Sequence, residues 1–272
     1  MQSISKFKSN IKAHYRAHGR DLPWRHTKDP YRILVSEIML QQTQVARVLQ
    51  KYPEFLKHFP NFKSLAEARQ ADVLRVWQGM GYNRRALALT RIAVRVRDDY
   101  RGRLPRDQEI LKTFPGIGSN TAGAIAAFAF NVPAPFIETN IRRTFIHFFF
   151  SKRRKVHDDE IIPLVEKTLD RKNSREWYYA LMDYGSALAL SLSKGANPNR
   201  KSAHYRRQSA FEGSSRQVRG KILRILTRNV HATHRELTTA IPAPTEMIAK
   251  ALEELFREGF IEVRQSRVTI KA

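Results

Sequence analysis

Apolar residues recur at helical spacing through most of the first 190 positions of the chain, and the alternating pattern typical of strands is scarce there. Two segments each place their apolar residues on a single helical face. The first face is Leu65, Ala68, Val73, Leu74 and Trp77, and the second is Ala86, Leu89, Ile92, Ala93 and Val96. Segment 121–130, TAGAIAAFAF, is small and apolar on every side, which predicts a helix that is buried all round. Segment 162–192 continues the helical pattern, with Gly195 as its predicted stop. We therefore expect an all-α body.

The helical pattern breaks at residues 193–215, which are polar and basic and carry three aromatic rings, those of His204, Tyr205 and Phe211. This composition predicts a linker that either wraps the body or lies on a partner. The pattern then restarts and predicts helices at 217–229, 234–241 and 244–259, followed by a hairpin at 260–272.

Three helices followed by a two-stranded wing is the order of a winged-helix domain, in which the third helix faces a DNA groove. That helix contains the acidic run EELFRE, so packing against the body and direct base reading are both open for it. The predicted domains are the body at 1–192, the linker at 193–215 and a winged-helix-like domain at 216–272.

The charge of the chain points to a polyanionic partner. Lysine and arginine number 49 against 25 acidic residues, which gives a formal net charge of +24. An excess of this size is typical of proteins that bind nucleic acid. The alternative is a cationic, highly soluble surface without a specific partner.

Several classes of protein are excluded or disfavoured by composition. The sequence holds no run of about 18 apolar residues that would span a membrane. Its first residues lack the features of a secretory signal, so the cytoplasm, at the nucleoid, is the expected location. Cysteine is absent, and this excludes disulfides, thiolate zinc sites and cysteine-ligated iron–sulfur clusters. The histidines show no metal-ligand spacing, so neither a metal nor a cofactor is expected.

Segment 114–123, FPGIGSNTAG, combines a Pro-Gly-x-Gly turn with the start of a helix. Glycines allow the backbone to approach a phosphate closely, and the helix dipole favours a negative charge at that end. An ordinary tight connection between two helices is the alternative for this motif taken alone.

Segment 29–49 carries a carboxylate inside an apolar pattern. On a helix, Glu37 shares a face with Ile33, Leu40 and Gln44, where it would be partly desolvated. Desolvation raises the pKa of a carboxylic acid and suits it to donate a proton. A surface glutamate paired with an arginine is the alternative. The neighbouring QQTQ offers uncharged amides, which suit contact with bases rather than phosphates.

Four segments in this order, PYRILVSEIMLQQTQV, VWQGMGYNRRA, FPGIGSNTAGAI and IETNIRR, resemble the helix-hairpin-helix (HhH-GPD) DNA glycosylases, and most of all the MutY-type adenine glycosylases. The resemblance runs from about Asp21 to Gly185. It implies a two-lobed all-α body that binds double-stranded DNA as a monomer and accepts a flipped base. It also implies a monofunctional enzyme that hydrolyses the N-glycosidic bond of adenine opposite G or 8-oxoguanine.

The resemblance assigns roles to individual residues. Glu37 matches the general acid that protonates the leaving purine, Glu138 stands where the family has a catalytic aspartate, and Asn140 lies beside it. Base-pocket positions are Trp24, Arg25 and Asp183, and the intercalating positions are Gln42 and Tyr82. The phosphate-binding hairpin corresponds to Pro115, Gly116, Ile117, Gly118, Asn120 and Thr121, where the family often binds a monovalent cation through carbonyls. Backbone contacts are expected from Arg84, Arg85, Arg142 and Arg143.

The chain also departs from the family. Glu138 replaces the family aspartate, and its extra methylene moves the charge by about a bond length. Asn120 stands where strand-cleaving relatives have a Schiff-base lysine, which implies that no lyase activity is present. The four cysteines that hold an iron–sulfur cluster in most members are missing, and the winged-helix-like segment replaces a Nudix-like domain.

Two other functions remain open at this point. Related mismatch glycosylases remove thymine or uracil, and another damaged base such as hypoxanthine is a further option. A DNA damage-binding protein without catalysis is an alternative from another class, because of Glu138. Retention of Glu37 and QQTQ argues against it, since binding alone needs no proton donor.

Overall fold

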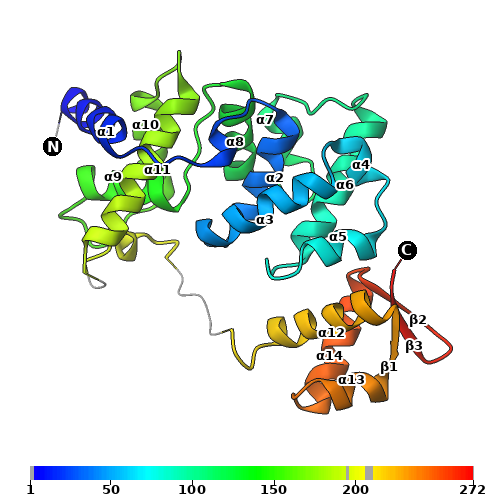
Figure 1. The fold of residues 1–272 in the computed structure, drawn as a ribbon. Coiled ribbons are helices and arrows are strands. Elements are labelled where there is room, and N and C mark those ends of the chain that lie inside the picture. The colour runs from blue at the N-terminus through cyan, green and yellow to red at the C-terminus, as the bar shows by residue number, and fades with distance from the viewer. Residues whose placement is uncertain (1–2, 194–195, 206–210, 272) are drawn as a thin grey trace. The chain divides into compact units, whose positions relative to one another are not determined.

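The computed structural model describes residues 3–193, 196–205 and 211–271, and most of them are helical (Figure 1). The chain forms two compact units, each made from two stretches of sequence. Unit 1 contains Met1–Glu37 and Pro105–Arg207, and unit 2 contains Ile38–Leu104 and Gln208–Ala272. The expectation of an all-α body with a small α-plus-β region at the C-terminal end is confirmed. The predicted domain boundaries at 192 and 215 stay a prediction.

Unit 1 is built from helices. They are α1 (Ile4–His18), η1 (Pro23–Arg25), most of α2 (Pro30–Leu40), α7 (Gln108–Lys112), α8 (Ser119–Phe130), α9 (Thr139–Phe149), α10 (Asp158–Thr168), α11 (Ser174–Ser191) and η2 (Pro198–Lys201). Among the described residues of the chain, no helix is long and apolar enough to cross a membrane.

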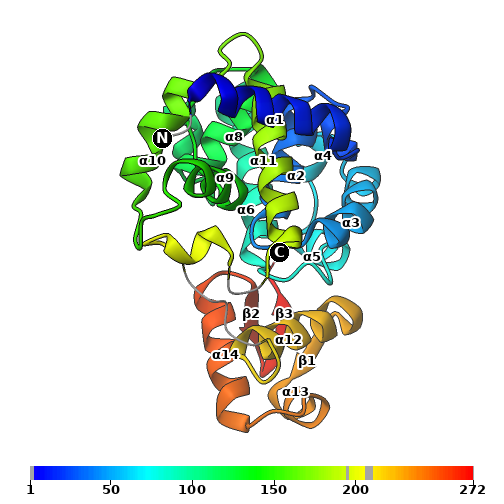
Figure 2. The same cartoon turned by 90° about the vertical axis from the view of Figure 1, so that its left-hand side faces the viewer.

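Aromatic side chains join three helices of unit 1. Phe7 of α1 lies between rings of α9 and α11, with ring centroids 5.2 Å from Phe145 and 6.0 Å from Trp177. Helix α11 packs against both α1 and α9, and the three helices lie close together in Figure 2. Large rings packed edge to face bury much apolar surface, so this cluster fixes the framework that carries α9.

The all-round apolar segment is confirmed as the buried helix α8. Its alanines are closed to solvent, and Gly123 leaves room for the neighbouring chain. A Cβ atom on Gly123 would lie 2.7 Å from Cβ of Phe136, which no pair of carbon atoms tolerates. Small residues on α8 therefore allow the segment that leads to α9 to pack directly on the helix.

The predicted helix 162–192 is two helices in the structure. Helix α10 ends at Thr168, and α11 starts at Ser174. Asp170 accepts hydrogen bonds from the amides of Lys172 and Asn173, and its carbonyl accepts one from Ser174 Oγ, so the polar run between the helices forms a turn. Helix α11 ends at Ser191, and the predicted stop at Gly195 lies outside the described residues.

Residues 196–205 of the linker pack on unit 1. Asn199 Nδ2 donates to the carbonyl of Thr139, at 2.9 Å. Val156 N donates to the carbonyl of Lys201, and Ala203 N donates to the carbonyl of Val156, both at 2.8 Å. Residues 199–203 therefore contact the body, and contact of the linker with DNA stays a prediction.

Unit 2 has a helical part and a C-terminal module. The helical part is the end of α2 with α3 (Val45–His58), α4 (Phe62–Ala66), α5 (Gln70–Val76) and α6 (Arg84–Asp99). The C-terminal module, residues 215–270, is α12 (Ser215–Asn229), β1 (His231–Thr233), α13 (His234–Ala240), α14 (Thr245–Arg257), β2 (Ile261–Arg264) and β3 (Arg267–Ile270).

The C-terminal module has the winged-helix order, with one strand more than the sequence predicted. Strands β2 and β3 form the expected hairpin, in which Val263 pairs with Val268. Strand β1 adds to β3 in antiparallel register, with Ala232 opposite Val268, so the sheet order is β1-β3-β2. A strand of three residues gives no alternation that sequence could reveal.

Polar side chains join the C-terminal module to α5 and α6 within unit 2. Gln70 Nε2 donates to the carbonyls of Gly259 and Phe260, at 3.1 and 3.0 Å. Arg75 donates to the carbonyl of Thr227 at 3.1 Å. Glu258, the C-cap residue of α14, pairs with Arg84 of α6. Base reading by this helix stays a prediction.

Adding one methyl group to two different helical glycines should have opposite effects on stability. Gly123→Ala is expected to lower the free energy of unfolding by about 1–3 kcal/mol, because the new Cβ overlaps Phe136. Gly220→Ala on α12 meets nothing within 4 Å, so helix propensity should raise that free energy by about 0.5–1 kcal/mol. Urea denaturation measures both. A gain at Gly123 would contradict the tight packing of α8.

Candidate active site

Glu37 lies near the C-terminal end of α2, in an apolar stretch of the helix. The helix begins at Pro30, and Asp29 Oδ1 accepts a hydrogen bond from the amide of Tyr31 in its first turn. The flanking residues Ser36 and Ile38 are closed to solvent, whereas Glu37 keeps partial access. Burial and the negative charge of Glu138 together raise the pKa of Glu37 to about 8, and the positive charge of Arg25 acts in the opposite direction. The carboxyl of Glu37 therefore carries a proton at neutral pH.

One part of the predicted helical face around Glu37 is wrong. Helix α2 ends at Leu40, and α3 starts after Gln44, so Gln44 does not share a helix with Glu37. The QQTQ residues form the loop between the two helices instead, and Gln42 in this loop has a φ of 53°. A backbone in the left-handed region cannot continue an α-helix.

Glu138 caps the N-terminus of α9. Its Oε1 accepts hydrogen bonds from the amides of Asn140 and Ile141, at 2.7 and 2.8 Å, and its Oε2 accepts one from Asn140 Nδ2 at 3.2 Å. Burial raises the pKa of Glu138, while these amide donors and the nearby Arg143 act in the opposite direction. The longer glutamate side chain thus takes the position in which a short N-cap residue normally binds the first turn.

The two carboxyl groups have unequal surroundings. Glu138 is held by two helix amides and a side-chain amide, all of which favour its anion. Burial and the negative charge of Glu138 both oppose ionisation of Glu37, whereas the positive charge of Arg25 favours it. These surroundings favour the protonated form of Glu37, whereas the amide donors favour the anion of Glu138. A protonated acid beside a fixed carboxylate is the arrangement required to cleave a glycosidic bond.

Asn140 is held in place by α11. Its side-chain Oδ1 accepts a hydrogen bond from Arg143 at 2.7 Å, and Arg143 also donates to the carbonyl of Gly185 at 2.7 Å. A Cβ atom on Gly185 would lie 2.2 Å from the carbonyl oxygen of Asn140. Only glycine allows this approach, so Gly185 positions the first turn of α9. A glycine inside an apolar helical segment indicates close packing, and this was the signal in the sequence that could have identified Gly185.

The carboxylate of Asp183 accepts hydrogen bonds from both Arg25 and Arg20. The guanidinium of Arg25 donates to both carboxylate oxygens of Asp183, at 2.8 and 2.7 Å. Arg20, which the sequence analysis missed, adds its backbone amide at 2.8 Å and its Nε at 2.6 Å. Four donors fill the acceptor capacity of a carboxylate. Asp183 is 2% exposed.

Arg25 lies against an aromatic ring and has one donor left over. Its guanidinium carbon is 4.5 Å from the centre of the Tyr179 ring, which stacks on Phe128 with centroids 4.6 Å apart. Arg25 Nε is buried and has no hydrogen-bond partner in the described part of the chain. Trp24, the third residue predicted for the base pocket, is buried beside it in η1. The structure thus brings Arg25 and Asp183 into direct contact.

The glycine hairpin connects α7 to α8. Gly116 has a φ of 77°, and the amide of Ile117 donates to the carbonyl of Phe114, which closes the turn. Gly118 precedes α8 without a side-chain cap, and a Cβ atom there would meet nothing within 4 Å. The hairpin is therefore open on the side where a phosphate would approach the helix. Binding of a phosphate or a monovalent cation here stays a prediction.

Asn120 has a structural partner near the second carboxylate. Its Oδ1 accepts a hydrogen bond from the amide of Ile137 at 3.1 Å, one residue before Glu138. This bond links the start of α8 to the segment that positions Glu138.

Unit 2 carries the two residues predicted to intercalate. Gln42 and Tyr82 are both non-glycine residues with a positive φ, 53° and 46°, and each stands in a loop. Such a conformation costs about 1 kcal/mol or more per residue and persists where the surroundings enforce it. Gln42 is exposed and Tyr82 is half-buried.

Arg85 joins the two loops that hold Gln42 and Tyr82. Its NH1 donates to the carbonyls of Ile38 and Met39 at the end of α2 and to that of Gln41. Its NH2 and Nε donate to the second loop, at the carbonyls of Met80, Gly81 and Tyr82. Burial lowers the pKa of Arg85 to about 10, so it remains a cation at neutral pH.

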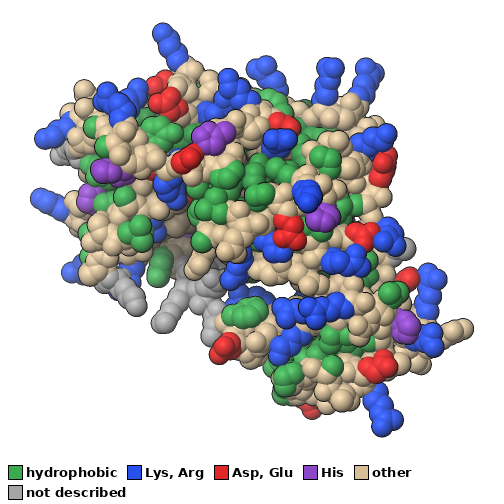
Figure 3. Space-filling view, in the orientation of Figure 1, with side chains coloured by type: hydrophobic (Ala, Val, Ile, Leu, Met, Phe, Trp, Pro, Cys, Tyr) green, Lys and Arg blue, Asp and Glu red, His purple; other side chains and the backbone are tan. Residues whose placement is uncertain are grey.

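The four arginines predicted to contact the DNA backbone all have partners within the protein. Arg84 pairs with Glu258 and Arg142 pairs with Asp158, while Arg85 and Arg143 are buried among carbonyls and amides. Their contact with DNA is not tested by these bonds and stays a prediction. Other lysine and arginine side chains project from much of the face drawn in Figure 3.

The residues present do not fit an iron–sulfur cluster. The sequence contains no cysteine, and the described residues hold no group of three or more histidine, aspartate or glutamate side chains that could bind a metal. No chemical step at this site is therefore assigned to a cluster.

The pKa of Glu37 should respond to its two charged neighbours in opposite directions. Glu138→Gln is expected to lower it, because a negative charge is removed, and Arg25→Gln should raise it, because a positive charge is removed. Carbon NMR of glutamate-labelled protein measures the titration, with Glu37→Gln to assign the signal. Glu246→Gln on α14 is the control and should change nothing. A pKa of Glu37 near 4.5 in the unmodified protein would contradict the description of this site.

The sequence of the chain was compared with those of known proteins. Residues 35–167 match the HhH-GPD superfamily of base excision DNA repair proteins. The chain is 34% identical to an adenine DNA glycosylase of Mycobacterium tuberculosis, over 93% of this chain and 89% of that protein. An adenine DNA glycosylase of Mycolicibacterium smegmatis is also 34% identical, over 89% and 88%.

The solved structures agree with the sequence relatives. A thermostable thymine-DNA glycosylase matches 67% of this chain and 86% of its own length, with 28% identity and a TM-score of 0.61. Endonuclease III in a non-covalent DNA complex shares the fold at 17% identity, with a TM-score of 0.58 over 67% of this chain and 85% of that one. The resemblance that the four sequence segments indicated is thereby confirmed. The chain belongs to the HhH-GPD superfamily of base excision DNA repair proteins and is one of its DNA glycosylases.

Proposed function

We propose that the chain removes adenine from double-stranded DNA where adenine stands opposite G or 8-oxoguanine. What supports this most is the unequal pair of carboxyl groups: burial and the charge of Glu138 raise the pKa of Glu37 to about 8, and Glu138 accepts two amide hydrogen bonds at the N-terminus of α9. A purine leaves far more readily as a neutral molecule than as an anion, so a proton donor is the main chemical requirement. The relatives named adenine DNA glycosylase support the choice of base.

The reaction follows from the two carboxyl groups. Glu37 donates its proton to a ring nitrogen of the flipped adenine, and the bond between the sugar and the base breaks with its electron pair passing to the base. The positive charge left on the sugar is stabilised by Glu138, which α9 holds in place. Water then adds to the sugar carbon and releases a proton to Glu138. The products are free adenine and an abasic site.

The side chains around this pair have supporting roles in the proposal. Asn140 orients Glu138 through its hydrogen bond at 3.2 Å. Trp24 and Arg25 line the base pocket, and the unpaired Arg25 Nε is available to a base. Asp183 acts through Arg25, because its own oxygens are already occupied.

The remaining contacts are made with the DNA. The hairpin of Pro115, Gly116, Ile117, Gly118, Asn120 and Thr121 binds a backbone phosphate, and Gln42 and Tyr82 fill the gap that the flipped base leaves. Arg84, Arg85, Arg142 and Arg143 add charge beside the backbone. The enzyme acts as a monomer in the cytoplasm, at the nucleoid, and uses no cofactor.

We propose further that the enzyme does not cut the DNA strand. A lyase needs an amine that forms a Schiff base with the sugar. The residue at the corresponding position is Asn120, whose side chain is bonded to the amide of Ile137.

A second candidate function is removal of thymine or uracil opposite G. It is favoured by the likeness to the thermostable thymine-DNA glycosylase. The proton on Glu37 argues for adenine, because an acid poised near neutral pH matches the protonation of a purine ring.

The rate of base release should depend on pH through both carboxyl groups. Above about pH 8, Glu37 loses its proton and the single-turnover rate on an A·8-oxoguanine duplex should fall. At acid pH the rate should fall as Glu138 takes up a proton. The midpoint of this fall should lie at a higher pH than the usual pKa of a glutamate, because burial raises the pKa of Glu138. Glu37→Gln should lower the rate about a hundred-fold or more.

The control for this experiment is Glu246→Gln, which should keep the full rate and the same pH profile. A rate that stays constant from pH 7 to 10, or a Glu37→Gln variant with full activity, would overturn the assignment of Glu37 as the acid.

A further inference from the structure

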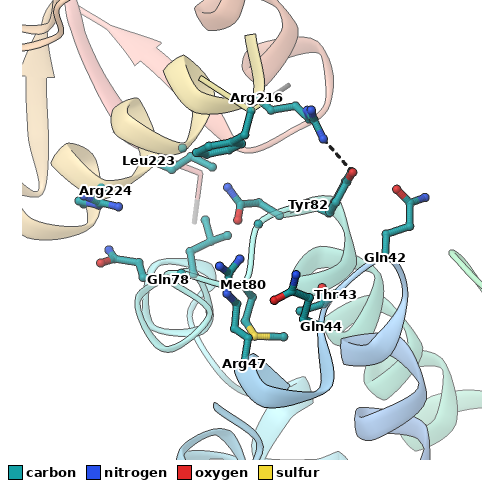
Figure 4. A pocket seen from close by; sticks show the side chains of 16 residues that line it. Gln42, Thr43, Gln44, Arg47, Gln78, Met80, Tyr82, Arg216, Leu223 and Arg224 are labelled. Carbon is teal, nitrogen blue, oxygen red and sulfur yellow. Dashed lines mark hydrogen bonds between the residues drawn. The ribbon is translucent and has the colours of Figure 1, made fainter. Parts of the chain in front are cut away.

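Arg216 occupies a position that its own helix disfavours. It is the second residue of α12, and the N-terminal turn of a helix carries a partial positive charge that repels a cation. Helix α12 has no acidic residue in this turn to compensate. The guanidinium of Arg216 instead contacts Tyr82, with its NH1 donating to the Tyr82 hydroxyl at 2.8 Å (Figure 4).

Tyr82 lies between two guanidinium groups. The carbon at the centre of the Arg216 guanidinium is 5.7 Å from the centre of the Tyr82 ring, and that of Arg85 is 5.5 Å from it. Arg85 also binds the backbone carbonyl of Tyr82, whereas Arg216 binds the far end of the side chain. The backbone and the hydroxyl of this residue are therefore fixed by two different helices, α6 and α12.

The Tyr82 side chain borders open space. A cavity of about 420 Å³ adjoins it, bounded by the two loops on one side and by α12 on the other. Its lining includes Gln78, Met80, Leu223 and Arg224, which Figure 4 shows around an open space. An aromatic ring beside such a cavity has space for other rotamers, and the directional bond from Arg216 favours the observed one.

Ion pairs fix α12 relative to Tyr82. Two residues after Tyr82, Arg84 pairs with Glu258 of α14, with its Nε 2.7 Å from the carboxylate. Glu258 also accepts from Arg219, at 2.7 Å, and Arg219 stands three residues after Arg216 on α12. The hydrogen bond from Arg84, together with those from Arg219, lowers the pKa of Glu258 to about 2, so the cluster keeps its charge at all working pH values.

We propose that Arg216 is a positioning residue that holds Tyr82 ready to enter the DNA stack, so that the C-terminal module takes part in opening the duplex. This inference rests on the proposed function, in which Tyr82 intercalates beside the flipped nucleotide. A side chain that is already fixed loses less conformational entropy when it intercalates than a mobile one does. Arg216 acts through Tyr82 and has no contact with the reacting atoms in this scheme.

The test is a double-mutant cycle of Arg216→Gln and Tyr82→Phe. The readouts are the fluorescence of 2-aminopurine placed next to the target adenine, which reports unstacking, and the single-turnover rate of adenine release. Arg216→Gln should reduce the unstacked fraction roughly five-fold, because a charged hydrogen bond is lost. Tyr82→Phe removes the same bond from the other side, so the double variant should be no worse than the stronger single one.

Three further variants separate positioning from charge and from folding. Arg228→Gln removes an exposed charge from the same helix and should leave both readouts unchanged. Arg216→Lys keeps a cationic donor and should restore part of the effect. The melting temperature of Arg216→Gln should stay within a few degrees of the parent, because the ion pairs of Arg219 remain.

The outcomes distinguish this inference from the proposed function. If the parent protein unstacks the duplex and releases adenine while Arg216→Gln behaves like Arg228→Gln, the positioning role is wrong and the proposed function stands. Additive losses in the cycle would also overturn the positioning role, since Arg216 would then act independently of Tyr82. If the parent protein neither unstacks DNA nor releases adenine, both the proposed function and this inference fall.

Discussion

The N-terminus of α9 is the feature on which the site depends. Its two free amides bind one carboxylate, that of Glu138, and so decide which of two neighbouring acids is ionised. Once Glu138 is an anion, its charge and the surrounding protein hold the proton on Glu37. One helix end therefore gives the two carboxyl groups different surroundings.

Other parts of unit 1 preserve this helix end. Gly185 of α11 lies so close to Asn140 that no side chain fits between them, and Arg143 binds both residues. Asn120 fixes the backbone just before Glu138. These contacts fix the first turn of α9, where the Glu138 side chain folds back as the cap of the helix.

Unit 2 uses buried arginine in a comparable way. Arg85 gathers the carbonyls of two loops that have no regular structure of their own, and it thereby stabilises two backbone conformations that are costly for residues with side chains. A lysine could not replace it, since a single ammonium group cannot reach acceptors in both loops. The loops carry Gln42 and Tyr82, so their conformation is set before any DNA is bound.

The sequence predicted those features that depend on local pattern. Helix α8 followed from an unbroken run of small apolar residues, and the hairpin followed from glycines ahead of a helix start. The break at Leu169 was missed because apolar residues continue on both sides of it, and strand β1 was missed because three residues carry no period. The sequence segments pointed to Glu37 and Glu138, but the cap geometry, Arg20 and Gly185 depend on contacts between residues far apart in the chain. The burial of Arg85 could not be predicted either, because an arginine in a segment expected to contact DNA is normally assumed to be exposed.

The central claim is that an acid and a fixed carboxylate release adenine. It is tested most directly by single-turnover base release on a panel of labelled duplexes containing A·G, A·8-oxoguanine, T·G, U·G, hypoxanthine·T and 8-oxoguanine·C, with alkali added to reveal abasic sites. We expect release of adenine from the first two, no strand cleavage before alkali, and loss of release in Glu37→Gln. Release of a pyrimidine alone, or of no base from any duplex, would contradict it.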